Sequence, residues 1–173
     1  IKDETIVGIM GAAGSGKTTL LQIMAGLLVA HQGQITIDGK PNVSKKNVGL
    51  VFQFPEMQFV QDTVETEIAY GLTFQKLNKN EIKSRVENSM ELVGLPLAEY
   101  KNKRLNSLSS GEKRRVALAT ILALESQYLL LDEPTAGLDY QGRQDLHNTL
   151  LDLKANDRTI VLVSHNLNYL FSV

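Results

Sequence analysis

A glycine-rich segment near the start of the chain has the residue types and spacing of a phosphate-binding loop. It follows the pattern Gly-x-x-x-x-Gly-Lys-Thr from Gly11 to Thr18, after a short apolar run and before helix-forming residues. The glycines allow successive backbone N–H groups to face a polyphosphate, whose approach a Cβ atom would obstruct. Lys17 supplies a cation for the β- and γ-phosphates, and the Thr18 hydroxyl is suited to bind Mg²⁺. The pattern favours a nucleoside triphosphate site over a glycine-rich turn that merely precedes a helix.

Two adjacent carboxylates form the second candidate group. Asp132 and Glu133 follow the apolar residues 128–131, and the carboxyl ends of parallel strands meet at the sheet edge where a phosphate-binding loop also lies. Neighbouring strand residues point to opposite sides, so the two carboxylates are expected to have different roles. One can hold the Mg²⁺ shell through water, while the other orients and polarises an attacking water. The alternative is a pair of solvated charges, which the stiff loop beginning at Pro134 disfavours.

The residues Ser109-Ser110-Gly111-Glu112 have two compatible interpretations. With Ser109 as N-cap and Glu112 as the third helical residue, they form a capping box that stabilises any helix by about 1 kcal/mol. A hydroxyl, a glycine and free N–H groups at a helix start also form an anion site. Gly111 favours the second interpretation, because glycine lowers helix propensity and a capping box does not need it.

The elements that must position these residues alternate between strand-like and helix-like patterns. Apolar, β-branched runs typical of strands buried on both faces occur at residues 5–10, 48–52, 128–131 and 159–163. His165 follows the last run and should reach the same sheet edge, either as a ligand or as a satisfied structural residue. Residues 34–39 alternate and end in a turn pair, Asp38-Gly39, and residues 63–125 read as helices. The pattern predicts an α/β fold with a mostly parallel sheet, a small antiparallel β region and an inserted helical subdomain.

Composition excludes several classes of protein. The chain has 173 residues, 43% of them hydrophobic, which suits one domain with a sizeable core. It contains no cysteine, which excludes a disulfide scaffold, a thiolate metal site and a cysteine nucleophile. The net charge of −1 argues against a protein that coats nucleic acid. No apolar run approaches the roughly 18 residues that span a bilayer, so any membrane role would depend on a partner protein.

Taken together, the motifs resemble those of ATP-binding-cassette (ABC) ATPases in type and order. They are the phosphate-binding loop, Gln53 after a strand, Leu108-Ser109-Ser110-Gly111-Glu112, the Asp132-Glu133 strand, Gly137-Leu138-Asp139 and His165. The serine–glycine signature within a helical insertion is the specific part, because other classes with this loop lack it. Residues 51–60, 62–64 and 69–72 also resemble the ATPase subunits of energy-coupling-factor (ECF) importers.

This resemblance implies a P-loop NTPase (RecA-like) core formed by residues 1–62 and 126–173. Residues 63–125 would be the helical subdomain that carries the signature. Residues 1–173 would then be a single ABC nucleotide-binding domain that is partial at both ends. Nothing aromatic precedes Phe52 to stack on adenine, and family members usually continue past the histidine with further strands.

The resemblance also assigns roles to single residues. The nucleotide-binding residues would be Gly11, Ala12, Ala13, Gly14, Ser15, Gly16, Lys17, Thr18 and Thr19, with Ser109, Gly111 and Asp139 facing a second subunit. Mg²⁺ would be held by Thr18, Gln53 and Asp132. Catalysis would depend on Glu133 as the base, assisted by His165, Gln53 and Lys17. ATP and Mg²⁺ are the expected substrate and cofactor of an ATP hydrolase.

The implied assembly is a head-to-tail dimer of ABC ATPase subunits, homomeric or heteromeric, with two ATP molecules between them. It would power an importer of vitamins or metal ions from the cytoplasmic face of the cell membrane, as a peripheral subunit. Residues 54–64 would face transmembrane transporter subunits, and nucleic acid is not an expected partner. The alternatives are a non-transport ABC ATPase, active in DNA repair or on ribosomes, and a P-loop kinase or simple nucleotide-binding module.

The signature departs from its commonest form at two positions. Ser110 and Glu112 stand where glycine and glutamine are usual. Glu112 adds negative charge near a phosphate site, which would weaken closure of the dimer. This weakening is expected unless Lys113, Arg114 or Arg115 offsets the charge.

Overall fold

The computed structural model of the chain describes residue 1 and residues 3–37, 40–41 and 48–165. Packing of the backbone divides the chain into two units. The first, here named the sheet unit, contains Ile1–Gln53, Ser126–Pro134 and Leu150–Val173. The second, named the helical unit, contains Phe54–Glu125 and Thr135–Thr149.

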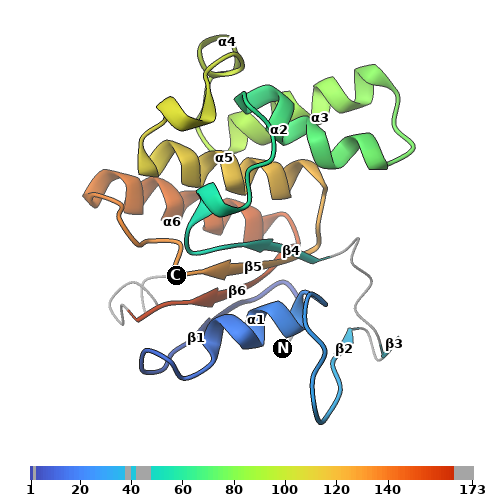
Figure 1. Cartoon of the computed structure of the whole chain (residues 1–173), viewed down its shortest axis with the longest axis vertical. Coiled ribbons are helices and arrows are strands. Elements are labelled where there is room, and N and C mark those ends of the chain that lie inside the picture. Colours follow the sequence, from blue (N-terminus) through green and yellow to red (C-terminus); the bar gives the residue numbers. More distant parts are fainter. Residues whose placement is uncertain (2, 38–39, 42–47, 166–173) are drawn as a thin grey trace. The chain divides into compact units, whose positions relative to one another are not determined.

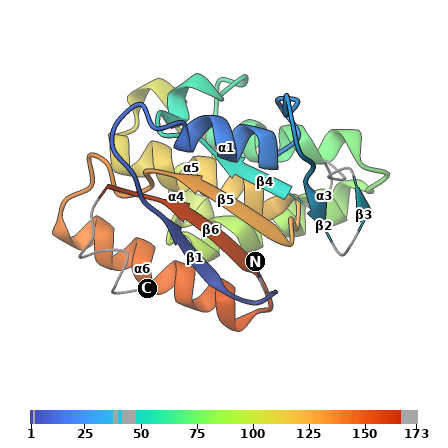
Figure 2. The ribbon, with the colours of Figure 1, turned by 90° about the horizontal axis from the view of Figure 1, so that it is seen from below.

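A parallel sheet with the strand order β1-β6-β5-β4 is the centre of the sheet unit, as Figure 2 shows. Its strands are β1 (Ile6–Ile9), β4 (Val48–Val51), β5 (Tyr128–Asp132) and β6 (Thr159–Val163). Every residue of β6 is buried, which explains why its sequence is continuously apolar rather than alternating. The predicted mostly parallel sheet is confirmed.

Helix α1 (Lys17–Met24) packs on this sheet. The fully buried Leu21 and the adjoining Ala25 contact side chains of β4, β5 and β6, namely Leu50, Leu130, Val161 and Val163. Burial of a leucine side chain contributes about 2 kcal/mol. This packing fixes the first turn of α1 beyond the carboxyl end of β1, so the intervening loop lies at the edge where functional residues of parallel sheets gather.

A small antiparallel pair accompanies the main sheet. Strand β2 (Thr36–Ile37) runs antiparallel to β3 (Lys40–Pro41), with Ile37 opposite Lys40. The predicted antiparallel region is therefore confirmed. The turn predicted at Asp38-Gly39 lies outside the described residues.

The helical unit is formed by helices joined through short turns (Figure 1). They are η1 (Pro55–Met57), α2 (Val64–Tyr70), η2 (Gly71–Phe74), α3 (Lys79–Leu92), α4 (Leu97–Tyr100), η3 (Leu105–Ser107) and α5 (Ser110–Ala123). Helix α6 (Tyr140–Ala155) begins here and continues into the sheet unit. Helices α2, α3 and α5 pack on one another, and Ile68, Met90 and Val116 are fully buried. Among the described residues, no helix combines the length and apolar character that a membrane span requires.

The segment between α4 and α5 is tied to the start of α2. The Val64 N–H donates to the Lys103 carbonyl at 3.1 Å, and the Leu105 N–H donates to the Asp62 carbonyl at 3.0 Å. These bonds accompany an antiparallel bridge between Thr63 and Arg104. The backbone that precedes α5 is therefore held by hydrogen bonds between residues distant in sequence.

Candidate active site

The predicted phosphate-binding loop joins β1 to α1 and is open to solvent. Gly14 and Gly16 have φ angles of +74° and +87°, a left-handed conformation that glycine adopts without strain. A Cβ atom at either position would meet nothing within 4 Å, so it is the backbone conformation, and not crowding, that favours glycine here. At Gly11, a Cβ atom would lie 2.7 Å from the Ser15 hydroxyl, so a side chain there would force that hydroxyl to move.

Lys17 folds back over this loop. Its ammonium group donates to the carbonyl oxygens of Gly11 at 2.9 Å and Ala12 at 2.8 Å. Gly16 is the N-cap residue of α1 and has no side chain to cover the first N–H groups of the helix. The loop therefore presents a cation and a helix N-terminus together, an arrangement that suits an anion.

Thr18 and Asp132 are in direct contact across the sheet unit. The Thr18 hydroxyl donates to Asp132 Oδ2 at 2.6 Å, although the two residues are 114 positions apart in sequence. Asp132 ends β5 and is buried. A hydroxyl oxygen and a carboxylate oxygen are the hard ligands that Mg²⁺ prefers. The donor set at this edge therefore fits a magnesium ion.

Glu133 has a backbone conformation that is rare for a residue with a side chain. Its φ angle is +47°, a left-handed value that costs about 1–2 kcal/mol for such residues. Its N–H donates to the Val163 carbonyl at 2.9 Å, which anchors the backbone to β6. The side chain, only 9% exposed, lies 2.9 Å from His165 Nδ1 through Oε1 and accepts from the Ser164 hydroxyl at 3.4 Å through Oε2.

The two carboxylates have different partners, although Glu133 lies beyond the end of β5, where the alternation of strand residues no longer applies. Asp132 contacts Thr18, and Glu133 contacts His165. Gln53 follows β4, whose Val51 pairs with Leu131 of β5, so Gln53 and Glu133 occupy equivalent positions beyond neighbouring strands. The sequence did not single out Ser164, because a serine after a strand carries no distinctive signal.

The signature residues lie in the helical unit, at the start of α5. Ser109 is the N-cap: its N–H donates to Glu112 Oε2 at 2.7 Å, and the Glu112 N–H donates to Ser109 Oγ at 3.3 Å. The predicted capping box is confirmed. Ser109, Gly111 and Asp139 line one pocket of about 480 Å³, so the structure brings these three predicted residues together. Asp139 also accepts from the Gly142 N–H at 2.8 Å.

The Glu112 carboxylate is strongly stabilised in its ionised form. The hydrogen bond from the Ser109 backbone, followed by those from the Ser109 and Tyr100 side chains, lowers the pKa of Glu112 from 4.5 to about 2. Among neighbouring charges, Lys103 also favours the carboxylate. Whether Lys113, Arg114 or Arg115 offsets the Glu112 charge in a dimer stays a prediction. Sequence patterns gave no signal for Tyr100 or Lys103, because both precede α5 in a different element.

Acid should destabilise the protein partly through Glu112. Its pKa is lower in the folded state than in the unfolded chain, so its contribution to stability is complete above about pH 4.5 and is lost as the pH falls towards 2. Between about pH 5 and pH 3, we expect the melting temperature of Glu112→Gln to fall less than that of the wild type. Thermal unfolding followed by circular dichroism measures this difference, and equal losses in both proteins would contradict it.

Apolar side chains are exposed on the segment expected to face a membrane partner. Phe54, Met57 and Val60 are 54%, 80% and 62% exposed. They belong to residues 54–64, around the short helix η1. Exposed apolar side chains that gather on one segment mark interaction surfaces more often than isolated ones do.

A buried carboxylate holds this segment in shape. Glu67 of α2 is 3% exposed, and its Oε2 accepts from the N–H groups of Val60 at 2.9 Å and Gln61 at 2.8 Å. Two backbone donors satisfy the buried charge. The sequence analysis missed Glu67, because its role depends on a turn that no local pattern reveals.

The chain belongs to the ABC transporter family, whose family model matches residues 1–136. The family predicted from the motifs is confirmed. The EcfA2 energy-coupling factor transporter ATP-binding protein of Clostridium tetani is 43% identical, with 96% of this chain and 61% of that protein covered. The EcfA2 protein of Clostridium perfringens is 44% identical, with coverages of 96% and 62%. The chain thus spans about three fifths of the length of these relatives.

Solved structures agree with this assignment. CbiO1 of Clostridium perfringens, described as part of the ABC transporter complex CbiONQ, has a TM-score of 0.85 at 34% identity, with 96% of this chain and 69% of that chain covered. The ATP-binding cassette MJ0796, in a dimeric post-hydrolysis state bound to ADP and Pi, has a TM-score of 0.89 at 27% identity, with coverages of 99% and 79%. The predicted P-loop NTPase fold is confirmed.

Proposed function

We propose that this chain binds ATP and Mg²⁺ and hydrolyses ATP as the motor subunit of an ECF-type importer of vitamins or metal ions. The observation that supports this proposal best is the meeting of Thr18 and Asp132 at 2.6 Å beside an open phosphate-binding loop. The contact between Glu133 and His165 at the ends of neighbouring strands adds a catalytic group. The names of the relatives, ECF transporter ATP-binding proteins, support the transport role.

The phosphates would be bound by residues 11–19. The N-terminus of α1, where Gly16 provides no side-chain cap, would offer backbone N–H groups to the phosphates. The Lys17 ammonium would exchange its carbonyl partners for phosphate oxygens, which compete well because they carry full negative charge. Thr19, exposed in the first turn of α1, completes this group.

Thr18, Asp132 and Gln53 would hold Mg²⁺. When bound, the ion supplies positive charge that stabilises the negative charge developing on the phosphate oxygens. The buried Asp132 sets the position of the Thr18 hydroxyl through the 2.6 Å contact. Gln53 follows β4 at the same sheet edge, since β4 and β5 are parallel neighbours.

Glu133 would accept the proton of the water that attacks the γ-phosphorus. Its carboxylate is buried and is oriented by His165 and Ser164. The anchored backbone of Glu133 keeps the side chain at this place despite its left-handed φ angle. Proton transfer by a positioned carboxylate typically contributes 10²–10⁴ in rate.

A second ABC ATPase subunit, identical or related, would complete each site in a head-to-tail dimer. Ser109 and Gly111 would contact the γ-phosphate bound by the other subunit, and Asp139 would lie at the interface. Their shared pocket supports this proposal, as does the dimeric state of MJ0796. We infer that residues 1–62 and 126–173 form the ABC core and that residues 63–125 form the helical subdomain that carries the signature.

Transmembrane transporter subunits would bind the apolar side chains of residues 54–64. The exposure of Phe54, Met57 and Val60 supports this docking surface. The protein would then be peripheral, on the cytoplasmic face of the membrane. The net charge of −1 disfavours nucleic acid as a partner.

Lys17→Ala tests the proposal directly. We expect the full-length wild-type protein to bind ATP in the presence of Mg²⁺, and the variant to bind at least ten-fold more weakly, because a charge-assisted contact of about 1.5–3 kcal/mol is lost. Titration calorimetry measures both affinities. Lys79→Ala, which removes an exposed lysine from the first turn of α3, is the matched control. Equal affinity of Lys17→Ala and the wild type would contradict the proposed site.

A further inference from the structure

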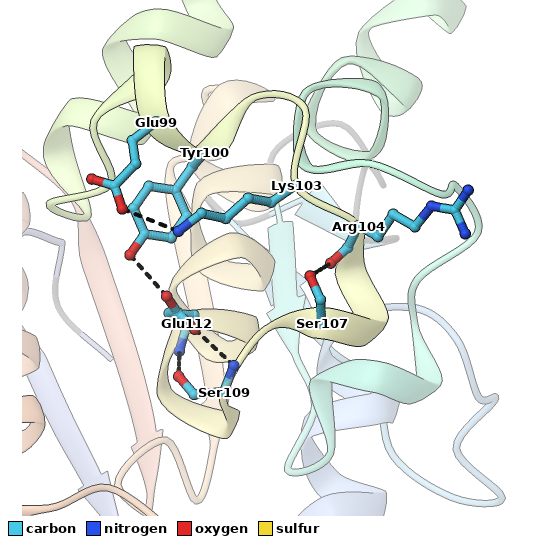
Figure 3. Close-up of polar contacts among 7 residues, drawn as sticks. All are labelled: Glu99, Tyr100, Lys103, Arg104, Ser107, Ser109 and Glu112. Carbon is cyan, nitrogen blue, oxygen red and sulfur yellow. Dashed lines mark hydrogen bonds and ion pairs between the residues drawn. The ribbon is translucent and has the colours of Figure 1, made fainter.

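A series of polar contacts connects α4 to the first turn of α5, as Figure 3 shows. Glu112 is at its centre. Its Oε2 accepts from the Ser109 N–H at 2.7 Å, and its Oε1 accepts from the Tyr100 hydroxyl at 2.8 Å. Each carboxylate oxygen therefore has a donor: one is the N-cap residue of α5, and the other is a residue of α4. Rotation of the carboxylate would break one of these bonds.

Tyr100 is itself held by a second contact. The ammonium group of Lys103 lies 3.6 Å from the centroid of the Tyr100 ring, a distance at which a cation is attracted to an aromatic face. The same ammonium donates to Glu99 Oε1 at 3.1 Å. The Lys103 carbonyl accepts from the Val64 N–H, so the backbone that carries this ammonium is tied to α2.

The N-cap of α5 depends on Glu112 more than on the Ser109 hydroxyl. The bond from the Ser109 N–H to the carboxylate is 2.7 Å long, whereas the reciprocal bond to the hydroxyl is 3.3 Å. A short, charge-assisted hydrogen bond is stronger than a long one between neutral groups. The backbone of Ser109 is thus firmly held by the Glu112 carboxylate.

The chemistry of the two donors explains why a glutamate suits this position. The Ser109 N–H can only donate, and the Tyr100 hydroxyl donates here as well. A carboxylate offers an acceptor oxygen to each donor, whereas a glutamine offers one oxygen and one NH₂ group. Tyr100 and Glu112 therefore form a matched pair.

We propose that Tyr100 is a positioning residue for the signature serine. Through Glu112, it fixes the Ser109 backbone in the orientation in which Ser109 and Gly111 bind a phosphate held by the second subunit. This inference rests on the proposed function. Tyr100, which lies outside the signature, would thus help to orient Ser109 and Gly111 toward the phosphate.

The test uses the full-length protein in its assembled transporter, with ATP varied so that kcat and KM are separated. Tyr100→Phe removes the hydroxyl and keeps the ring beneath Lys103. We expect kcat to fall about five-fold, because the ionised Glu112 carboxylate loses the hydrogen bond from the Tyr100 hydroxyl. We expect KM to change by less than about two-fold. Ser107→Ala is the matched control: it removes a hydroxyl that donates to the Arg104 carbonyl at 2.7 Å in the same segment (Figure 3) and should keep the wild-type kcat.

A double-mutant cycle with Glu112→Ala shows whether Tyr100 acts through Glu112. We expect Tyr100→Phe to change kcat by less than about 1.5-fold in the Glu112→Ala background, since the acceptor is already absent. If the two substitutions acted independently, Tyr100→Phe would lower kcat by the same factor in both backgrounds. Thermal unfolding of each variant shows that the compared proteins are folded at the assay temperature.

The inference is overturned if Tyr100→Phe retains the kcat of Ser107→Ala, or if it lowers kcat equally with and without the Glu112 carboxylate. Either result with an active wild-type transporter leaves the proposed function intact. If the wild-type assembly does not hydrolyse ATP, the proposed function fails, and the inference fails with it.

Discussion

Replacement of Glu133 with glutamine should lower ATP turnover by at least about 100-fold while ATP binding stays intact. The amide oxygen can still accept from His165 Nδ1, which lies 2.9 Å from the carboxylate in the wild type. It cannot accept a proton from the attacking water, however. Because the γ-phosphate would remain uncleaved, the ATP-bound dimer should accumulate.

Single-turnover hydrolysis and size-exclusion chromatography with ATP measure these two effects. Glu87→Gln makes the same chemical change on the surface of α3, where the carboxylate is 45% exposed and 3.8 Å from Lys83. This control should keep wild-type turnover. Normal turnover by Glu133→Gln would remove Glu133 from the role of proton acceptor.

Gly111→Val should abolish hydrolysis although each subunit still binds ATP. A Cβ atom at Gly111 would lie 3.5 Å from Leu138, an ordinary contact, so α5 can accept a side chain there. The added methyl groups would occupy the pocket that Ser109 and Asp139 also line. We expect hydrolysis to fall at least about 100-fold through loss of phosphate contacts and the nucleotide affinity of the separate subunit to change less than about two-fold.

Asn80→Val is the matched control for this substitution. Asn80 is the second residue of α3, as Gly111 is the second residue of α5, and both helices begin with a capping box. The control should keep its hydrolysis rate. If Gly111→Val lowers only the melting temperature, the residues around it act as a helix cap, and the chain is a simple nucleotide-binding module.

Patterns that are local in sequence predicted the strands and the loop well. Residues 159–163 coincide with β6 (Thr159–Val163), because a strand buried on both faces must be apolar throughout. The run at 128–131 is one residue shorter than β5, since Asp132 still pairs with Val163. The phosphate-binding loop was visible because its conformation requires glycine at fixed positions.

Contacts between distant residues could not be predicted in the same way. The sequence indicates that Thr18 and Asp132 reach one sheet edge, but the strand order that brings them within 2.6 Å leaves no local pattern. The short helix α4 follows Pro96 and has only four residues, Leu97–Tyr100, too few for a periodic sequence pattern. Tyr100 is the last residue of α4, so its hydrogen bond to Glu112 could not be predicted either.

The back-folded ammonium of Lys17 has a consequence for how the loop would bind an anion. Its two carbonyl partners keep the loop in shape before any ligand arrives, so little chain entropy is lost on loading. The incoming ligand must also displace those carbonyls, which reduces the net gain of the exchange. We therefore expect Lys17 to contribute less to anion affinity than a cation without other hydrogen-bond partners would.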